Sequence, residues 1–199
     1  MPENAALSLT IRPAIAADLA SIAAIYRDAV ENGGGSYELE PPSLGEMGQR
    51  FEAVRAAGMP WIVAETDGAI AGYAYASAFR PRPAYRFMAE DSVYVAPEHK
   101  GKGMGKTLLT ALIGELSGLG FRQVCAVIGD GKGNPGSVAL HEALGFRHSG
   151  VIAGSGFKFG RWLDTVIMQL ELNGGTASPP DPASLPEMRF RASLRAPQG

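Results

Sequence analysis

The sequence predicts a mixed α/β fold in which helices flank a central sheet, and two observations support this. Segments with the composition of strands alternate along the chain with amphipathic segments that have the period of a helix. The chain has 199 residues, of which 46% are hydrophobic and 19% charged, which is enough to bury the core of one domain. Strands that precede and follow helices in this order are typical of a mixed α/β sheet.

Seven segments have the composition expected of strands. They span residues 7–13, 61–65, 69–79, 90–95, 121–128, 148–157 and 163–172. Pro13 ends the first of them, and a turn at Asp67-Gly68 joins the second to the third. No internal repeat is present.

Four helices are expected between these strands. The first begins near Asp18 and stops at three consecutive glycines, residues 33–35. Ser43 and Glu46 have the spacing of a capping box, which begins the second helix. The other two are expected from Gly103 to about Leu116, and from Asn134-Pro135 to near Gly145.

The composition changes after Asn173. Residues 174–199 are rich in proline, glycine and serine and show little apolar periodicity. We therefore expect one domain over residues 1–173 and a C-terminal tail outside its core over residues 174–199.

Charge and cysteine usage exclude several classes of protein. A formal net charge of −2 argues against a nucleic-acid binder that works through overall positive charge. Cys125 is the single cysteine, which excludes an internal disulfide and a cysteine-based zinc cluster, and no metal is expected. No segment approaches the roughly 20 apolar residues of a membrane span, and residues 1–10 lack the features of a signal peptide. We expect a cytoplasmic protein without membrane partners.

The segment VYVAPEHKGKGMGKTLL, residues 93–109, carries alternating glycines where a strand hands over to a helix. The glycines are Gly101, Gly103 and Gly105, and the lysines among them are Lys100, Lys102 and Lys106. Glycine costs a helix about 1 kcal/mol relative to alanine, so a bare backbone must serve a purpose here. Such a loop lets N–H groups converge on an anion at the positive end of a helix. A glycine-rich turn with solvated lysines explains the loop equally well when it is taken alone.

Two familiar phosphate-binding motifs do not fit this loop. The phosphate-loop pattern GxxxxGK[ST] fails because the spacing from Gly101 to Gly105 is one residue short. The dinucleotide pattern GxGxxG fails because its third glycine comes one residue early. A nucleotide hydrolase is therefore a weak alternative.

Taken with other segments, the loop resembles the GCN5-related N-acetyltransferase (GNAT) family. Lys100, Gly103 and Gly105 occupy the positions of the family motif Arg/Gln-x-x-Gly-x-Gly/Ala, with Lys in place of Arg or Gln. The segments WIVAETDGAIAGYAYA, AEDSVYV, HEALGF and GFKFGRWLD match in the same order, and the resemblance covers about residues 9–172. It is closest to the phosphinothricin and methionine sulfoximine N-acetyltransferases. The resemblance implies a mixed, mostly antiparallel sheet flanked by helices, acetyl-CoA as co-substrate, and a homodimer.

The resemblance also implies which residues hold acetyl-CoA. The loop amides would hold its pyrophosphate, and the strand before the loop would pair with its pantetheine arm, which Asn134 also contacts. The implied set is Val93, Tyr94, Val95, Lys100, Gly101, Lys102, Gly103, Met104, Gly105, Lys106, Asn134 and Ser137. From the residues alone, Asn134 and Pro135 are equally well explained as the N-cap and first residue of a helix.

Acetyl transfer to an amine needs a base for the amine proton and a proton for the departing thiolate. The resemblance implies Glu90, at the start of the strand before the loop, as the general base, and places His141 near the sulfur. From the residues alone, Glu90 is better explained as a solvated carboxylate at a strand end, and His141 as a structural histidine. Asp91 is expected on the opposite side of the strand, as a weaker candidate for the same base.

The segment AFRPRPAYRF, residues 78–87, links two strands just ahead of Glu90. The resemblance implies that an arginine from this stretch holds the substrate carboxylate, and Arg82 aligns best with that arginine. The role suits arginine because the guanidinium fork pairs well with a carboxylate. The implied substrate-binding set is Arg80, Arg82, Tyr85, Glu90, Asp91 and Ser92. A plain surface loop is the alternative explanation of this segment.

The expected function is therefore acetyl-CoA-dependent N-acetylation of the α-amine of a small amino acid or analogue, of the methionine sulfoximine, methionine sulfone or phosphinothricin type. An enzyme of the same family that acts on a protein N-terminus or a polyamine stays open, although a polyamine site would want acids where the chain has Arg80 and Arg82. A non-catalytic acyl-CoA-binding module also stays open. The presence of both Glu90 and His141 argues against it.

Overall fold

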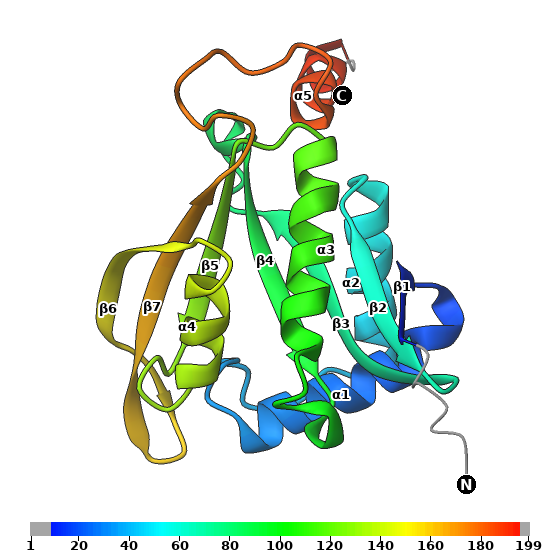
Figure 1. Cartoon of the computed structure of the whole chain (residues 1–199), viewed down its shortest axis with the longest axis vertical. Coiled ribbons are helices and arrows are strands. Elements are labelled where there is room, and N and C mark those ends of the chain that lie inside the picture. Colours follow the sequence, from blue (N-terminus) through cyan, green and yellow to red (C-terminus); the bar gives the residue numbers. More distant parts are fainter. Residues whose placement is uncertain (1–8, 196–199) are drawn as a thin grey trace, which may run out of the picture.

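The computed structural model describes residues 9–195, and its centre is a seven-stranded sheet (Figure 1). The strands are β1 (Leu9–Pro13), β2 (Trp61–Thr66), β3 (Ala69–Ala78), β4 (Met88–Val95), β5 (Gln123–Gly129), β6 (Arg147–Lys158) and β7 (Arg161–Glu171). Their order across the sheet is β1-β2-β3-β4-β5-β7-β6. Neighbouring strands run antiparallel, with the exception of β4 and β5, which are parallel.

Five α-helices accompany the sheet over the described residues. They are α1 (Leu19–Asn32), α2 (Leu44–Ala56), α3 (Met104–Gly118), α4 (Pro135–Glu142) and α5 (Leu185–Arg195). Three short 3₁₀ helices, η1 (Ala16–Asp18), η2 (Pro83–Tyr85) and η3 (Pro97–His99), lie in the connections. Helices α3 and α4 cover the face of the sheet that is nearer the viewer in Figure 1, and α1 and α2 cover the other face.

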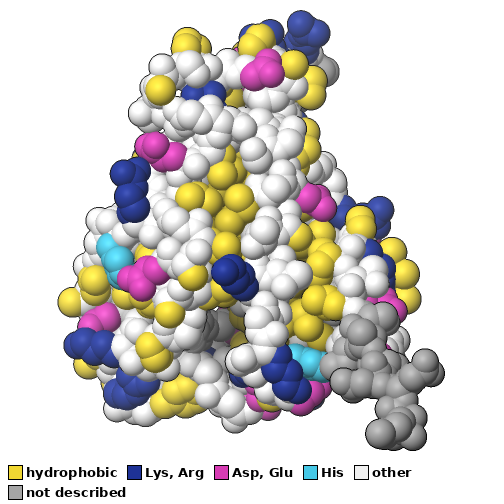
Figure 2. All heavy atoms as spheres, viewed as in Figure 1, with side chains coloured by type: hydrophobic (Ala, Val, Ile, Leu, Met, Phe, Trp, Pro, Cys, Tyr) yellow, Lys and Arg dark blue, Asp and Glu magenta, His cyan; other side chains and the backbone are white. Residues whose placement is uncertain are grey.

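Alternation along the strands produces one core on each face of the sheet. On one face Ile62 and Ala64 of β2 are buried with the leucines of α3, and on the other Trp61 and Val63 are buried with side chains of α1 and α2. Hydrophobic side chains are visible between α3 and α4 in Figure 2, where the sheet is not fully covered. The predicted mixed α/β fold of the GNAT type is confirmed.

Local signals in the sequence account for most element boundaries. Ser43 and Glu46 form the predicted capping box, with each side chain bonded to the other residue's backbone N–H. Asp67 and Gly68 both have positive φ, as a tight turn between β2 and β3 requires. The predicted start of the first strand, residues 7 and 8, lies outside the described residues.

The parallel strands β4 and β5 stay together over only three residue pairs. Met88, Ala89 and Glu90 of β4 pair with residues 123–125 of β5, and the register ends there. Figure 1 shows the two strands close at their upper ends and separated farther down. The edge of β4 over residues 91–95, which pairs with β3 on its other side, therefore faces an opening in the sheet.

The described part of the C-terminal segment packs against the rest of the chain. The buried Arg122 side chain donates hydrogen bonds to the carbonyl oxygens of Gly175, at 2.7 Å, and Ser178, at 3.0 Å. Leu185 packs against the core cluster, and Arg86 forms an ion pair with Glu187. The expected placement of this segment outside the core therefore needs correction over residues 174–195. The helix α5 was not predicted, because its anchoring contacts lie far away in the sequence. A domain boundary at residue 173 stays a prediction.

No helix within residues 9–195 is both long enough and apolar enough to cross a membrane. Over the same residues, no group of three or more His, Cys, Asp or Glu side chains is placed as a metal site would require.

Candidate active site

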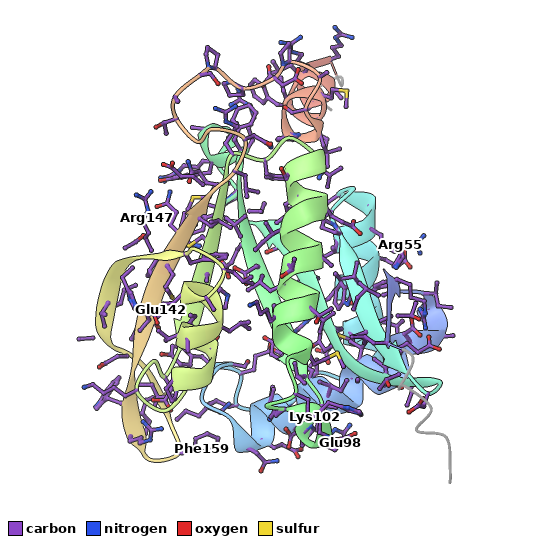
Figure 3. The ribbon with its side chains drawn as sticks, viewed as in Figure 1. Arg55, Glu98, Lys102, Glu142, Arg147 and Phe159 are labelled. Carbon is purple, nitrogen blue, oxygen red and sulfur yellow. The ribbon has the colours of Figure 1, made fainter. Side chains whose placement is uncertain are left out.

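A cleft of about 640 Å³ opens where β4 and β5 separate. Its walls are the edge of β4, the loop before α3, the first turns of α4, the middle of β5 and the segment after α1. From the predicted acetyl-CoA set it brings together Val93, Tyr94, Val95, Lys100, Gly101, Gly103, Met104, Gly105, Lys106, Asn134 and Ser137. Lys102 of that set does not line the cleft; Figure 3 shows it near Glu98, below the start of α3.

The glycine loop has the backbone conformation that only glycine adopts easily. Gly101 and Gly103 have φ angles of 74° and 81°, and Gly103 is the N-cap of α3. Gly105 lies in the first turn of α3, where an added Cβ would be 3.2 Å from Cδ2 of Leu140 on α4. The first N–H groups of a helix have no partner within that helix, and the residues that carry them in α3 line the cleft, which suits a phosphate.

Glu90 lies on the face of β4 that looks toward α1 and α2. Its side chain is half-buried, and Oε2 is 3.8 Å from Nη1 of Arg80. Burial raises the pKa of the Glu90 carboxyl above its ordinary value; the charge of Arg80 opposes this rise and the charge of Asp91 adds to it. Glu90 itself is not part of the cleft wall, although its neighbours Asp91 and Ser92 are.

Asp91 lies on the opposite side of β4, as alternation predicts, and it contacts His141 of α4. Oδ2 of Asp91 is 3.0 Å from Nε2 of His141, and both side chains are almost fully buried. Nδ1 of the same imidazole is 2.7 Å from the carbonyl oxygen of Ser137. The pair lines the cleft. The sequence placed Asp91 among the substrate contacts and did not anticipate its bond to His141.

The start of α4 is where the sequence predicts it, but Asn134 caps it differently. Asn134 is the N-cap residue and Pro135 the first helical residue, yet the Asn134 side chain makes no capping hydrogen bond. Its backbone N–H is instead bonded to the carbonyl oxygen of Asp130, at 2.7 Å. Helix capping therefore does not account for the amide side chain, which lies at the wall of the cleft.

The loop before β4 brings one of the predicted substrate residues close to Glu90. Arg80 reaches toward Glu90 while its guanidinium lies over the Phe79 ring, at 4.3 Å from the centroid. Arg82 and Tyr85 are exposed on the surface of the loop, where Tyr85 packs edge-on against Phe79. Arg80, rather than Arg82, thus brings a guanidinium to the predicted base.

The segment after α1 forms a further part of the cleft, although it is not among the predicted acetyl-CoA or substrate contacts. Residues 33–36 line it, and the buried Lys158 of β6 donates hydrogen bonds to the carbonyl oxygens of Gly33, at 3.1 Å, and Ser36, at 2.8 Å. Burial lowers the pKa of the Lys158 amine. A lysine at the end of a strand is an ordinary surface feature, so only the partner carbonyls, which lie about 120 residues away, reveal its role.

The fold, the cleft and the glycine loop together are typical of one class of protein, the acyltransferases. A profile of the Acetyltransferase (GNAT) family matches residues 22–146, which is more than half of the chain. The chain belongs to this family of acyltransferases.

Relatives with known names are similar over nearly the whole chain. A phosphinothricin N-acetyltransferase from Alcaligenes faecalis is 49% identical over 179 residues, which is 90% of each chain. An L-methionine sulfoximine/L-methionine sulfone acetyltransferase from Pseudomonas paraeruginosa is 40% identical over 174 residues, covering 87% of this chain and all of that protein. The crystal structure of a phosphinothricin acetyltransferase from Sinorhizobium meliloti in complex with AcCoA is 52% identical, with a TM-score of 0.87, and covers 91% of this chain and 97% of that one.

Proposed function

We propose that the protein transfers the acetyl group of acetyl-CoA directly to the α-amine of a small amino acid or analogue, with Glu90 as the general base. The observation that carries this proposal is the position of Glu90. It is a half-buried carboxylate with a raised pKa, one residue before the point at which β4 leaves β5 and the cleft begins. Such a carboxylate holds a proton taken from an amine more readily than an ordinary glutamate does, which suits a general base.

The chain offers matching groups for the co-substrate. The N–H groups of residues 103–105 at the start of α3 would bind the pyrophosphate, and the open edge of β4 would pair with the amide-bearing pantetheine arm as an added strand does. Two features fit acetyl-CoA because contacts within the chain do not explain them. They are the positive φ angles of the loop glycines and the Asn134 side-chain amide, which makes no capping hydrogen bond. The names of the relatives support acetyl-CoA as the acyl donor.

His141 lies on the cleft wall and would supply the proton for the departing thiolate. Arg80 and Arg82 would hold the substrate carboxylate, Arg80 close to Glu90 and Arg82 at the rim of the loop. Tyr85 and Ser92 would complete the amine side of the site, and the reaction would take place in the cytoplasm.

The substrate class is taken from the relatives. Phosphinothricin and methionine sulfoximine both carry an α-amine, an α-carboxylate and a tetrahedral polar group on the side chain. We propose that an amino acid of this shape is the preferred acceptor.

The direct test is acetyl-CoA-dependent thiol release with a panel of amines. The panel should include methionine sulfoximine, methionine sulfone, phosphinothricin, a polyamine and a peptide with a free N-terminus, each with its decarboxylated or amidated counterpart where one exists. We expect kcat/KM to be highest for the free amino acids. Equal rates with amines that lack a carboxylate would contradict the proposed acceptor class, and no turnover with any amine would leave an acyl-CoA-binding module.

We also propose a homodimer. The hairpin of β6 and β7 carries the large apolar side chains Val151, Ile152, Phe157, Phe159 and Trp162, each more than half exposed. A second copy of the chain covering this hairpin would remove that surface from water. Sedimentation of the wild-type protein and of Trp162→Asp tests this proposal: a dimer that the substitution weakens is the expected result, and a wild-type monomer would refute it.

A further inference from the structure

The buried pair formed by Asp91 and His141 poses a problem of proton count. Nδ1 of His141 faces the carbonyl oxygen of Ser137, and a carbonyl oxygen only accepts hydrogen bonds. The hydrogen of a neutral imidazole must therefore sit on Nδ1. That would leave the Nε2 lone pair 3.0 Å from a carboxylate oxygen of Asp91, with two acceptors facing each other in a buried site.

One additional proton removes this conflict. If it is on Nε2, His141 is an imidazolium that donates to Ser137 through Nδ1 and to Asp91 through Nε2, and the buried charges cancel. Phe146, which packs edge-on against the imidazole at 4.9 Å between ring centroids, carries no charge and does not compete for the proton. The remaining charged neighbour, Glu90, lies on the opposite face of β4.

We infer that Asp91 is a positioning residue: together with the Ser137 carbonyl it holds His141 as an imidazolium and so keeps a proton in the cleft for the departing thiolate. The inference rests on the proposed acetyl transfer and assigns Asp91 a role other than substrate binding. The pair lines the cleft, and Oδ1 of Asp91 is buried there with no hydrogen-bond partner among the described residues. A donor from outside the chain, water or ligand, is needed to satisfy that oxygen.

The electrostatics agree with the geometry. Burial by itself would lower the pKa of the His141 imidazolium, but the hydrogen bond and charge of Asp91, aided by the Ser137 carbonyl, outweigh burial, and the pKa rises above the ordinary histidine value. His141 therefore keeps its second proton at a pH at which an exposed histidine has lost it. A cationic donor of this kind matches the task of protonating a thiolate near neutral pH.

The proton balance of a turnover closes through solvent. The amine nitrogen forms the new bond to the acetyl carbon, and Glu90 takes the proton that the amine loses. The carbon–sulfur bond breaks with its electron pair on sulfur, and the sulfur takes the proton held between Nε2 of His141 and Oδ2 of Asp91, which breaks that hydrogen bond and leaves His141 neutral. The neutral ring then faces the Asp91 carboxylate with a lone pair, so it regains a proton from water, while Glu90 releases one to water. The pair is thereby reset.

Asp91→Asn is the sharpest test, because it removes the charge and keeps the shape. The amide of asparagine can donate to Nε2, so a neutral His141 with its hydrogen on Nδ1 becomes the stable form. The matched control is Glu142→Gln, since Glu142 and His148 form a second histidine–carboxylate pair, at 2.9 Å, that is exposed to solvent. Histidine side-chain ¹⁵N–¹H spectra of the full chain report both pairs at once, because the sequence has only three histidines.

We expect both ring nitrogens of His141 to carry hydrogen in the wild-type protein at a pH above the ordinary histidine pKa of about 6.5. In Asp91→Asn we expect a neutral His141, a loss of about tenfold or more in kcat, an unchanged KM for acetyl-CoA, and a fall in activity at alkaline pH that begins earlier. Glu142→Gln should change none of these. Should Asp91→Asn fail to fold, the wild-type spectra alone decide the charge of His141.

A neutral His141 in the wild-type spectra would overturn the inference even if the enzyme is active. An imidazolium combined with wild-type kcat and pH profile in Asp91→Asn would overturn the assigned role. Absence of acetyl transfer to every amine would instead defeat the proposed function, whereas the spectra would still report the protonation of the pair.

Discussion

Glu90 and Asp91 are neighbours in the sequence, yet β4 gives them opposite surroundings. Glu90 faces α1 and α2, is half-buried, and has Arg80 at 3.8 Å as its nearest positive charge. Asp91 faces α4, where its side chain is buried in a direct hydrogen bond to His141. Because side chains alternate between the two faces of a strand, one carboxylate is partly exposed and can exchange a proton, whereas the other is buried in a hydrogen-bonded pair.

The same sorting separates the two halves of the proposed reaction. The amine side of the site, Glu90 with Arg80, lies on the face of α1 and α2. The side of the departing thiolate, Asp91 with His141, lies on the face of α3 and α4. The strands β4 and β5 separate after Glu90, and Asp91 and His141 line the cleft that opens there, so in the proposed reaction the acetyl group would lie between the two sets of groups. Substitutions on one face should therefore leave the other face's parameters intact.

The largest expected effect comes from removing the base. Glu90→Gln keeps the size of the side chain but cannot accept the amine proton, so kcat should fall by about 10²–10⁴-fold while the KM for acetyl-CoA stays nearly constant. Steady-state kinetics with both substrates varied measure the two parameters separately. Glu98→Gln, an exposed carboxylate on η3, is the control and should behave as wild type. Wild-type turnover by Glu90→Gln would require another base.

The pH dependence of kcat/KM should reflect the ionisation of Glu90. Because its pKa is raised, chiefly by burial, the carboxyl holds its proton to a higher pH than an ordinary glutamate does. A base works only when deprotonated, so kcat/KM should fall as the pH drops through that raised pKa, and the acid limb should lie above the ordinary glutamate range. In Arg80→Ala the limb should move further up, because the arginine charge opposes the rise. An acid limb that stays in place in Arg80→Ala would argue against Glu90 as the titrating group.

The second-largest effect concerns the face of α3. In Gly105→Val the added side chain would press against Leu140 and stand beside the N–H groups proposed to bind the pyrophosphate, so the KM for acetyl-CoA should rise by tenfold or more, equivalent to about 1.4 kcal/mol. Gly114→Val is the matched control, since Gly114 lies in the same helix with open space around it. A folded Gly105→Val enzyme with unchanged affinity for acetyl-CoA would show that the loop does not hold phosphate.

The sequence predicted the fold well because its signals are local. The capping box at Ser43 and the alternation in β4 depend on residues within a few positions of one another, and the structure contains both. The cleft was predictable only through the glycine loop, whose special backbone leaves a trace in residue type. The hydrogen bond between Asp91 and His141 joins residues 50 positions apart, and the hydrogen bond from Lys158 to the Gly33 carbonyl joins residues 125 positions apart. Such contacts leave no trace in local composition.

Helix α5 is a second feature that local sequence signals did not predict. Its sequence is polar with few apolar anchors, which is why residues 174–199 were expected to lie outside the core. Arg86, at the end of the loop before β4, nevertheless donates a hydrogen bond to Glu187 and lies over the ring of Phe190. Contacts with the rest of the chain stabilise this segment, and the helix propensity of the segment itself does not reveal these contacts.

A smaller effect is expected on the amine side. Arg82→Ala should raise the KM of the amino acid by about tenfold, the value of one charge-assisted contact, with kcat and the KM for acetyl-CoA little changed. Arg55→Ala, on the exposed surface of α2, is the control for loss of a positive charge (Figure 3). If Arg82→Ala has no effect and Arg80→Ala raises the amino-acid KM, then Arg80 alone holds the carboxylate, and the choice of Arg82 by alignment is wrong.

The smallest effect should come from Lys102, which shares the glycine loop but not the cleft. Its side chain is exposed and is not part of the cleft wall, so its attraction for phosphate is screened by water and salt. Lys102→Ala should therefore raise the KM for acetyl-CoA by no more than a few-fold, within the roughly 0–1 kcal/mol of an exposed ion pair. The difference between Lys102→Ala and wild type should also vanish as salt is raised, whereas the defect of Gly105→Val should persist, because a steric block is not screened. Measuring both variants at low and high ionic strength separates the two causes. A Lys102→Ala defect as large as that of Gly105→Val and insensitive to salt would mean that the lysine enters the cleft when the co-substrate binds.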